Sequence, residues 1–267
     1  CSHITKIQLP DISLIDEGTF YKCSSLSDDL IFPKTLKYIY DYAFFDCYGF
    51  HCNLIFPPNL KEIGDFAFCG CSGFIGDLDI SSLTTDINAY AFCNCSGLDG
   101  KLTLPMEVKC VHNYSFYNCN LLKGTIKCIY IIQIDSYAFA FCSSLNEILY
   151  ISDVSNIGNN AFEGCSRLKG EVYFYKTEFI GSYAFANCSG LSGSLQFSSS
   201  YLYDINEYAF YGCSGIEEVI FSNTLKKIDA FAFCGCSSIR KITMGEKIEY
   251  IGEKAFYDCH QLCGELS

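Results

Sequence analysis

NNAFEGCSRL, residues 159–168, places a Phe three residues before a Cys, which precedes a Leu by three residues. The same phrase returns as DYAFFDCYGF (residues 41–50), SYAFANCSGL (residues 182–191) and EKAFYDCHQL (residues 253–262). A fixed internal period is typical of repeat architectures, in which each unit buries its apolar side chains against the next unit. The repeated Phe, found every 23 to 25 residues, is Phe20, Phe44, Phe68, Phe92, Phe116, Phe139, Phe162, Phe185, Phe210, Phe233 and Phe256.

Other positions recur with the Phe. Every copy has Cys three residues after it and Ile, or once Val111, five residues before it. One copy cannot fold alone, because about six buried side chains at roughly 1.5–3 kcal/mol each do not offset backbone ordering at roughly 1–2 kcal/mol per residue. We therefore expect a single solenoid over residues 1–267, with about eleven repeats of 23–25 residues. We also expect it to be a segment of a longer chain, or to self-associate through its uncapped end coils.

Alternating apolar and polar residues follow each Cys, as in KLTLP (residues 101–105) and EVYFY (residues 171–175). A period of two predicts a strand with one buried face. Asp, Asn or Gly flanks most Ala-Phe pairs on both sides, which suits the two ends of a short capped helical turn. The expected fold class is thus a right-handed, β-dominated α/β solenoid, with one parallel strand and one short helical turn in each coil.

Composition narrows the classes of partner. Thirty acidic and eighteen basic residues give a formal net charge of −12, which repels nucleic acid and anionic lipid. The longest apolar runs, such as residues 129–132, are far shorter than the roughly 20 residues that span a bilayer. We therefore expect no nucleic-acid partner and no direct membrane insertion of this segment.

The repeat resembles the BspA-like class of leucine-rich repeats. The pattern I-G-x-x-A-F-x-x-C-x-x-L-x-x-I-x-I-P is read in IGDFAFCGCSGFIGDLDI (residues 63–80) and IGEKAFYDCHQLCGEL (residues 251–266). The variant CSGLSGSL (residues 188–195), with one additional Gly before the strand, is similar to copies in surface proteins of mucosal protozoa such as trichomonads. The resemblance covers essentially the whole chain.

This resemblance implies a leucine-rich-repeat ectodomain that lies at the cell surface or outside the cell. It further implies adhesion, or binding to host proteins or cells, without enzymatic activity, catalytic residues or cofactors. The alternative is a structural or intracellular scaffold for protein interactions. Because no motif fixes the functional residues of such proteins, the resemblance assigns no site.

Nineteen cysteines raise the question of disulfides or metal binding. Twelve of them, counting Cys1, belong to the repeated column, where a small apolar side chain suits an inward bend. Cys128 occupies an inward strand position as well. The others are Cys52, Cys69, Cys93, Cys110, Cys234 and Cys263.

Two C-x-C phrases suggest more specific roles for four of the cysteines. Cys69 and Cys93 share a column in adjacent repeats, so a disulfide between them is one alternative to two free thiols. With Cys71 and Cys95 they superficially suggest a four-thiolate zinc site. However, Cys71 and Cys95 belong to the inward column, and we expect no metal ion.

No catalytic group emerges from the pattern. The histidines lie in different columns, so we expect no Cys/His or Ser/His/Asp site and no enzymatic activity. Asp77 and Asp79 share a strand face and could chelate calcium, but a solvated acidic strand edge is the interpretation that we favour. The four histidines are His3, His51, His112 and His260.

The outward strand positions form a candidate partner-binding face. Acidic residues around exposed apolar ones suit a basic patch on a protein partner. The alternative is that β-branched residues in these positions only stabilise the sheet. The candidate partner-binding face consists of Asp29, Ile31, Asp77, Asp79, Glu147, Leu149, Glu171, Tyr173, Glu218 and Ile220.

A second surface is an aromatic column two residues before the repeated Phe. We interpret it as packing between coils, with an adhesive stripe as the alternative. The aromatic column consists of Tyr42, Phe66, Tyr90, Tyr114, Tyr137, Tyr183, Tyr208 and Phe231.

Overall fold

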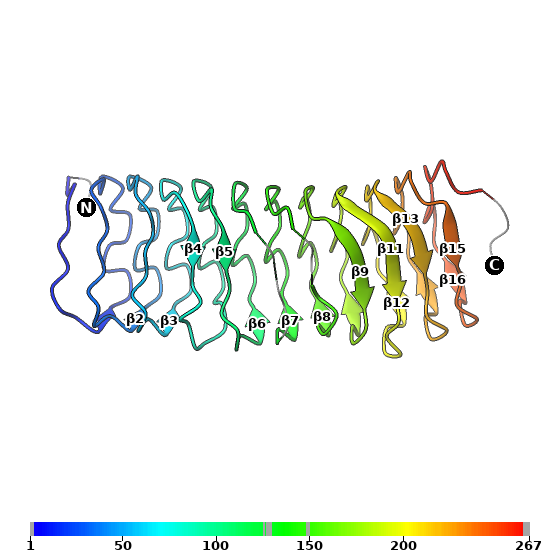
Figure 1. The fold of residues 1–267 in the computed structure, drawn as a ribbon, viewed down its shortest axis with the longest axis horizontal. Helices are drawn as coiled ribbons and strands as arrows, with labels where there is room; N and C mark the ends of the chain where they lie inside the picture. The colour runs from blue at the N-terminus through cyan, green and yellow to red at the C-terminus, as the bar shows by residue number, and fades with distance from the viewer. Residues whose placement is uncertain (1–2, 125, 127–129, 148–149, 264–267) are drawn as a thin grey trace.

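A computed structural model describes residues 3–124, 126, 130–147 and 150–263. Figure 1 shows an elongated stack of coils that follow each other in chain order along the long axis of the molecule. Every pairing between the described strands is parallel, and it joins a strand to the equivalent strand of a neighbouring coil. The predicted solenoid of parallel strands is therefore confirmed. Cys1, Cys128 and Leu149 lie outside the described residues.

Two-residue strands around the repeated Ile line one side of the solenoid, at the bottom of Figure 1. Like residues lie opposite each other, since Ile15 pairs with Ile39 and Ile39 pairs with Ile63. Short pieces of chain thus suffice, because each one completes a ladder that its neighbours continue. These strands are β1 (Leu14–Ile15), β2 (Tyr38–Ile39), β3 (Glu62–Ile63), β6 (Cys110–Val111), β7 (Gln133–Ile134), β8 (Asn156–Ile157), β10 (Phe179–Ile180), β12 (Asp204–Ile205), β14 (Lys227–Ile228) and β16 (Tyr250–Ile251).

The alternating runs after the Cys supply a second set of strands. Val172, Leu195, Val219 and Ile242 pair in register across one four-stranded sheet, and all four are buried. Their neighbours in the sequence point outward, as a period of two requires. These strands are β4 (Leu78–Asp79), β5 (Leu102–Thr103), β9 (Gly170–Phe174), β11 (Leu191–Phe197), β13 (Ile216–Ile220) and β15 (Lys241–Thr243).

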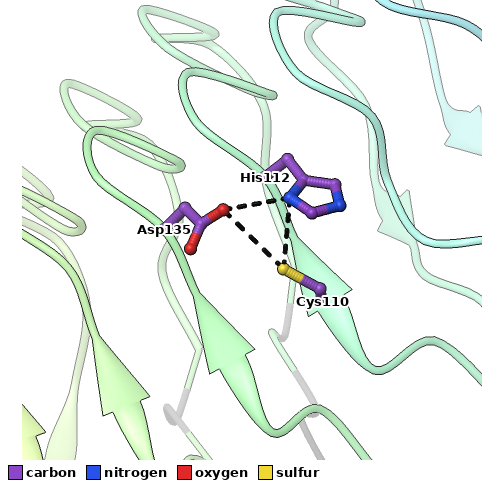
Figure 2. Close-up of side chains that lie close together, drawn as sticks. All are labelled: Cys110, His112 and Asp135. Carbon is purple, nitrogen blue, oxygen red and sulfur yellow. Dashed lines mark hydrogen bonds and ion pairs between the residues drawn. The ribbon is translucent and has the colours of Figure 1, made fainter.

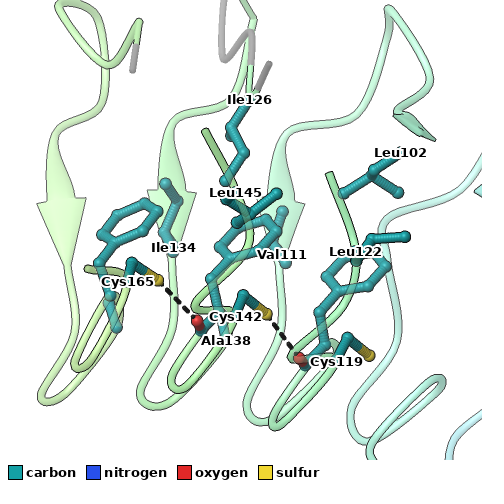
Figure 3. Packing of buried hydrophobic residues seen from close by; sticks show 14 of the residues in the cluster. Leu102, Val111, Cys119, Leu122, Ile126, Ile134, Ala138, Cys142, Leu145 and Cys165 are labelled. Atoms are coloured by element: carbon teal, nitrogen blue, oxygen red, sulfur yellow. Dashed lines mark hydrogen bonds between the residues drawn. The ribbon is translucent and has the colours of Figure 1, made fainter. Parts of the chain in front are cut away.

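The repeated Phe forms a stacked ladder through the core. From Phe20 to Phe256 each ring stacks on the ring of the next coil, with centroids 5.0–5.7 Å apart. Leu and Ile side chains from the two sets of strands close the core around this ladder (Figure 3). Each coil therefore presents the same apolar surface to both neighbours, which explains why the phrase repeats.

The Ala-Phe phrase differs from the prediction, because it forms tight turns instead of a helix. Around Phe44, the N–H of Phe44 donates to the carbonyl of Ala67 in the next coil at 2.8 Å, while the N–H of Cys47 donates back to the carbonyl of Phe44 at 3.1 Å. Tyr42 and Asp46 adopt left-handed backbone, with φ of 56° and 55°. A helix cannot form because alternate N–H groups point along the solenoid axis. The described residues accordingly include no helix able to span a membrane.

The repeated Cys has a specific role in this turn. The Cys142 thiol donates to the carbonyl of Phe116 in the preceding coil at 3.0 Å, and the Cys165 thiol donates to the carbonyl of Phe139 at 3.0 Å (Figure 3). Equivalent bonds of 2.9–3.4 Å recur from Cys47 to Cys259. The column therefore requires a small, mostly apolar side chain that still carries a donor, and Cys meets all three conditions.

Candidate functional site

The candidate partner-binding face lies on the outside of the second set of strands and of the equivalent segments in coils where no such strand is assigned. Asp29, Ile31, Asp77, Asp79, Glu147, Glu171 and Tyr173 are exposed, while Glu218 and Ile220 are half-buried. The predicted outward orientation is thus correct for every member that the structure describes.

Hydrogen bonds occupy the two carboxylates that the sequence offers as calcium ligands. Asp77 Oδ1 accepts from the N–H of Lys101 in the next coil at 2.7 Å, and Asp79 Oδ1 accepts from the N–H of Ser81 at 3.0 Å. These contacts give both residues a structural role in holding coils and turns. They support the interpretation of a solvated acidic strand edge.

Ion pairs balance part of the charge at the candidate partner-binding face. Glu218 pairs with Lys241 of the next coil at 2.5 Å, and its remaining oxygen accepts from Ser194 at 3.3 Å. The hydrogen bond from Lys241 lowers the pKa of Glu218 below its ordinary value. At the other end, Asp28 and Asp29 are both exposed beside Ile31. Asp28 pairs with Lys6 at 3.5 Å, as Glu218 pairs with Lys241, so part of the acidic charge is balanced at each end of this face.

The aromatic column packs ring on ring. From Tyr42 to Tyr137 successive rings are stacked with centroids 4.3–4.8 Å apart, and from Tyr183 to Phe231 the spacing is 4.5–4.8 Å. Asn160 occupies the equivalent position between the two stacks. All of the rings are half-buried, and every one belongs to a residue with positive φ. The predicted packing role is confirmed by these contacts.

Cys69 and Cys93 meet as expected from their shared column. Both are buried free thiols, and their hydrogen bond, followed by burial, raises the pKa of Cys69. Cys71 and Cys95 instead point inward and donate to the carbonyls of Phe44 and Phe68. All four cysteines are described, and their sulfur atoms do not converge into one metal-binding group.

A different group of side chains does converge. Figure 2 shows Cys110 on β6, His112 directly after β6 and Asp135 directly after β7. His112 Nδ1 lies 3.0 Å from Asp135 Oδ2, Cys110 Sγ lies 3.4 Å from His112 Nδ1, and Cys110 Sγ lies 3.8 Å from Asp135 Oδ2. The sequence-based expectation that no Cys/His site can be assembled is therefore wrong. We refer to these three residues as the Cys110 cluster.

The sheet itself brings the Cys110 cluster together. Val111 pairs with Ile134, and both are fully buried, so Cys110 and His112 on either side of Val111 point outward on one face. The same register places Asp135 of the next coil beside His112. The Cys110 side chain is nevertheless buried, with 8% of its surface exposed. The cluster is thus partly shielded by its neighbours.

Electrostatics around the thiol are strongly negative. Burial and then the carboxylates of Asp135 and Asp86 raise the pKa of Cys110 to about 12. Asp86 lies close because its Oδ1 accepts the N–H groups of Lys109 and Cys110, each at 2.9 Å. At neutral pH the thiol therefore keeps its proton, which makes it a poor nucleophile on its own. The same carboxylates would favour a bound cation.

The sequence carries a signal for this cluster. His112 and Asp135 are successive members of the column that is otherwise mostly Asp, Asn or Gly, and Cys110 precedes His112 by two residues. Interpreting that column as helix caps hides the signal, because residues i and i+2 do not share a helix face. In a strand they do share one. A strand assignment for residues 110–112 would have placed Cys110 and His112 on one face.

Comparisons with known proteins agree with the fold. No curated protein matches the chain. A leucine-rich repeat protein from Bacteroides ovatus has a similar structure, with 25% identity and a TM-score of 0.72 over 98% of this chain and 72% of that chain. A leucine rich cell surface protein from Faecalibacterium prausnitzii matches with 21% identity and a TM-score of 0.47, over 86% of this chain and 76% of that chain.

A family model gives the most direct assignment. The model of the BspA type leucine rich repeat region matches residues 1–95, 74–192 and 178–264. Together these matches cover nearly all of the stacked coils described above. The repeat phrase and the parallel coils agree with this family match, and the chain belongs to the BspA type leucine rich repeat family.

Proposed function

We propose that this chain is a non-enzymatic protein-binding ectodomain that mediates adhesion at the cell surface, and that it binds through the candidate partner-binding face. The observation that carries the proposal is the exposure of Ile31 and Ile55, at 75% and 69% of their surfaces. Ile55 follows Ile31 by 24 residues, so it holds the same outward position in the next coil and extends the candidate partner-binding face to that coil. Exposed apolar side chains next to each other are typical of surfaces that bind another protein.

The surroundings of this pair support a protein partner of opposite charge. Asp28 and Asp29 precede Ile31 in the chain, and these three residues line an open hollow of about 740 Å³ together with Ile7 and with Lys6, which pairs with Asp28 at 3.5 Å. An apolar centre with a charged rim is the usual composition of a protein interface. The net charge of −12 favours a partner with a basic surface, because opposite charges accelerate association.

A double substitution, Ile31→Asp with Ile55→Asp, tests the proposal. We expect it to lower the affinity of the fluorescently labelled chain for cultured mucosal epithelial cells about tenfold or more, since buried apolar anchors dominate interface energy. The measurement is a binding isotherm by flow cytometry, with circular dichroism to verify folding. Met106→Asp is the matched control, because Met106 is 71% exposed but outside this face. Unchanged binding of the double variant, or no binding of the unsubstituted chain, would contradict the proposal.

A further inference from the structure

We propose that the Cys110 cluster binds a zinc-like divalent cation, with Cys110 Sγ, His112 Nδ1 and Asp135 Oδ2 as ligands. The three atoms all lie within 4.8 Å of one another, and each comes from a residue type that coordinates zinc. This inference is independent of the proposed adhesive function, because the cluster lies on the two-residue strands around the repeated Ile and not on the candidate partner-binding face.

The separations between the three atoms match a tetrahedral metal. Ligands at zinc distances of about 2.0–2.3 Å in tetrahedral geometry are themselves about 3.3–3.6 Å apart. The observed separations are 3.0 Å for nitrogen to oxygen, 3.4 Å for sulfur to nitrogen and 3.8 Å for sulfur to oxygen. Shifts of a few tenths of an ångström would therefore accommodate the ion.

Two hydrogen bonds from neighbouring residues hold the ligands in this orientation. Gln133 Nε2 donates to Asp135 Oδ1 at 2.6 Å, which leaves Oδ2 directed at Cys110 and His112. The backbone of Cys110 is fixed by the bond from its N–H to Asp86 Oδ1 at 2.9 Å. Such outer contacts orient metal ligands and reduce the entropy that binding would otherwise cost.

The donor set selects among cations. A thiolate and an imidazole favour zinc and related transition metals, whereas calcium and magnesium prefer oxygen ligands alone. On binding, Cys110 forms its bond to the metal and releases its proton to solvent. Three protein ligands leave a fourth position open, and the 40% exposure of the His112 side chain places the cluster within reach of water.

A His–Asp hydrogen bond is the simpler explanation of two members of the cluster, but it does not account for the third. That hydrogen bond needs only His112 Nδ1 and Asp135 Oδ2, which are 3.0 Å apart. The thiol beside them makes only long contacts, at 3.4 Å to His112 Nδ1 and at 3.8 Å to Asp135 Oδ2. A bound cation would give all three side chains a common partner.

Cobalt and zinc titrations of the chelator-treated, reduced chain test the site. We expect one Co²⁺ per chain, with a thiolate-to-cobalt charge-transfer band and the visible bands of a tetrahedral site, and displacement of the cobalt by Zn²⁺. Cys110→Ser is expected to abolish the charge-transfer band. Gln133→Ala should lower zinc affinity about 10–100-fold, because Asp135 loses the hydrogen bond that orients it.

Two further variants separate this site from the other thiols. His112→Gln removes a half-exposed ligand, so it should preserve the fold while lowering zinc affinity about tenfold or more. Cys234→Ser is the matched control, because Cys234 is also a buried thiol outside the repeated column and should leave cobalt binding unchanged. The proposal is overturned if the folded chain shows no charge-transfer band, or if Cys110→Ser and His112→Gln bind metal as the unsubstituted chain does.

Discussion

Raising the pH from 8 to 11 is expected to unfold this chain, because its core contains a column of protonated thiols. Burial raises the pKa of Cys213 to about 12 from an ordinary value of 9.0, and it raises the pKa of Cys47 to about 12 as well. Burial likewise raises the pKa of the other column thiols, namely Cys71, Cys95, Cys119, Cys142, Cys165, Cys188, Cys236 and Cys259.

Stability falls as pH rises because the unfolded chain loses its thiol protons at lower pH than the folded chain does. Below pH 9 the thiols are protonated in both the folded and the unfolded chain, and their contribution to stability is fully present. Between pH 9 and the raised pKa of about 12, only the unfolded chain loses these protons, so stability falls as pH rises. Each such thiol reduces the free energy of unfolding by about 1.4 kcal/mol per pH unit. Several such thiols together would remove, by pH 11, a free energy comparable to the whole stability of an ordinary domain.

Urea denaturation at a series of pH values, in the presence of a reducing agent, measures this effect. Cys188→Ala with Cys213→Ala should make the decline shallower by about 1.4 kcal/mol per pH unit for each thiol removed. Cys263→Ala is the control, because Cys263 is exposed and its removal should leave the slope unchanged. An equal slope in the double variant would show that buried thiols do not limit alkaline stability.

Truncating one ring of the Phe ladder is expected to be the most damaging single change in the core. Phe139 is fully buried and stacks on Phe116 at 5.1 Å and on Phe162 at 5.4 Å. Phe139→Ala should lower the free energy of unfolding by about 3–5 kcal/mol, because it leaves a cavity between two coils. Both neighbours lose a stacking partner, so the effect is not confined to one coil.

The matched control for this substitution is Phe179→Ala. Phe179 also belongs to a regular coil, but 44% of its surface is exposed. Its truncation should change stability by less than about 1 kcal/mol. Urea unfolding of the two variants and the unsubstituted chain gives the comparison, and equal losses would mean that the ladder is not the principal core.

Much of the architecture is readable from the columns. A residue that recurs every 23 to 25 positions must face the same neighbour in every coil, so Phe162 and Cys165 could be assigned inward positions before any coordinates. Outward positions such as Ile31 and Tyr173 followed from a period of two. The local conformation of the Ala-Phe phrase did not follow. Asp, Asn and Gly suit both helix ends and left-handed turns, and sequence alone does not separate the two.

The Cys110 cluster, too, could be predicted only in part from the sequence. Its three residue types and their spacing are visible in the chain, but their convergence depends on residues 110–112 being extended. That conformation is decided by pairing with β7, which lies in the next coil. A contact between two coils is not a property of either segment by itself.

For this protein the amino-acid sequence alone determined the repeat, the inward columns and the stacking of coils, because identical spacing forces identical side chains into line. Only the tertiary structure decided that the Ala-Phe phrase turns without a helix and that Cys110, His112 and Asp135 meet. Both outcomes depend on hydrogen bonds between coils, such as that from Phe44 to Ala67. Those bonds exist only once neighbouring coils are in register, since each N–H must find its acceptor on another turn of the chain.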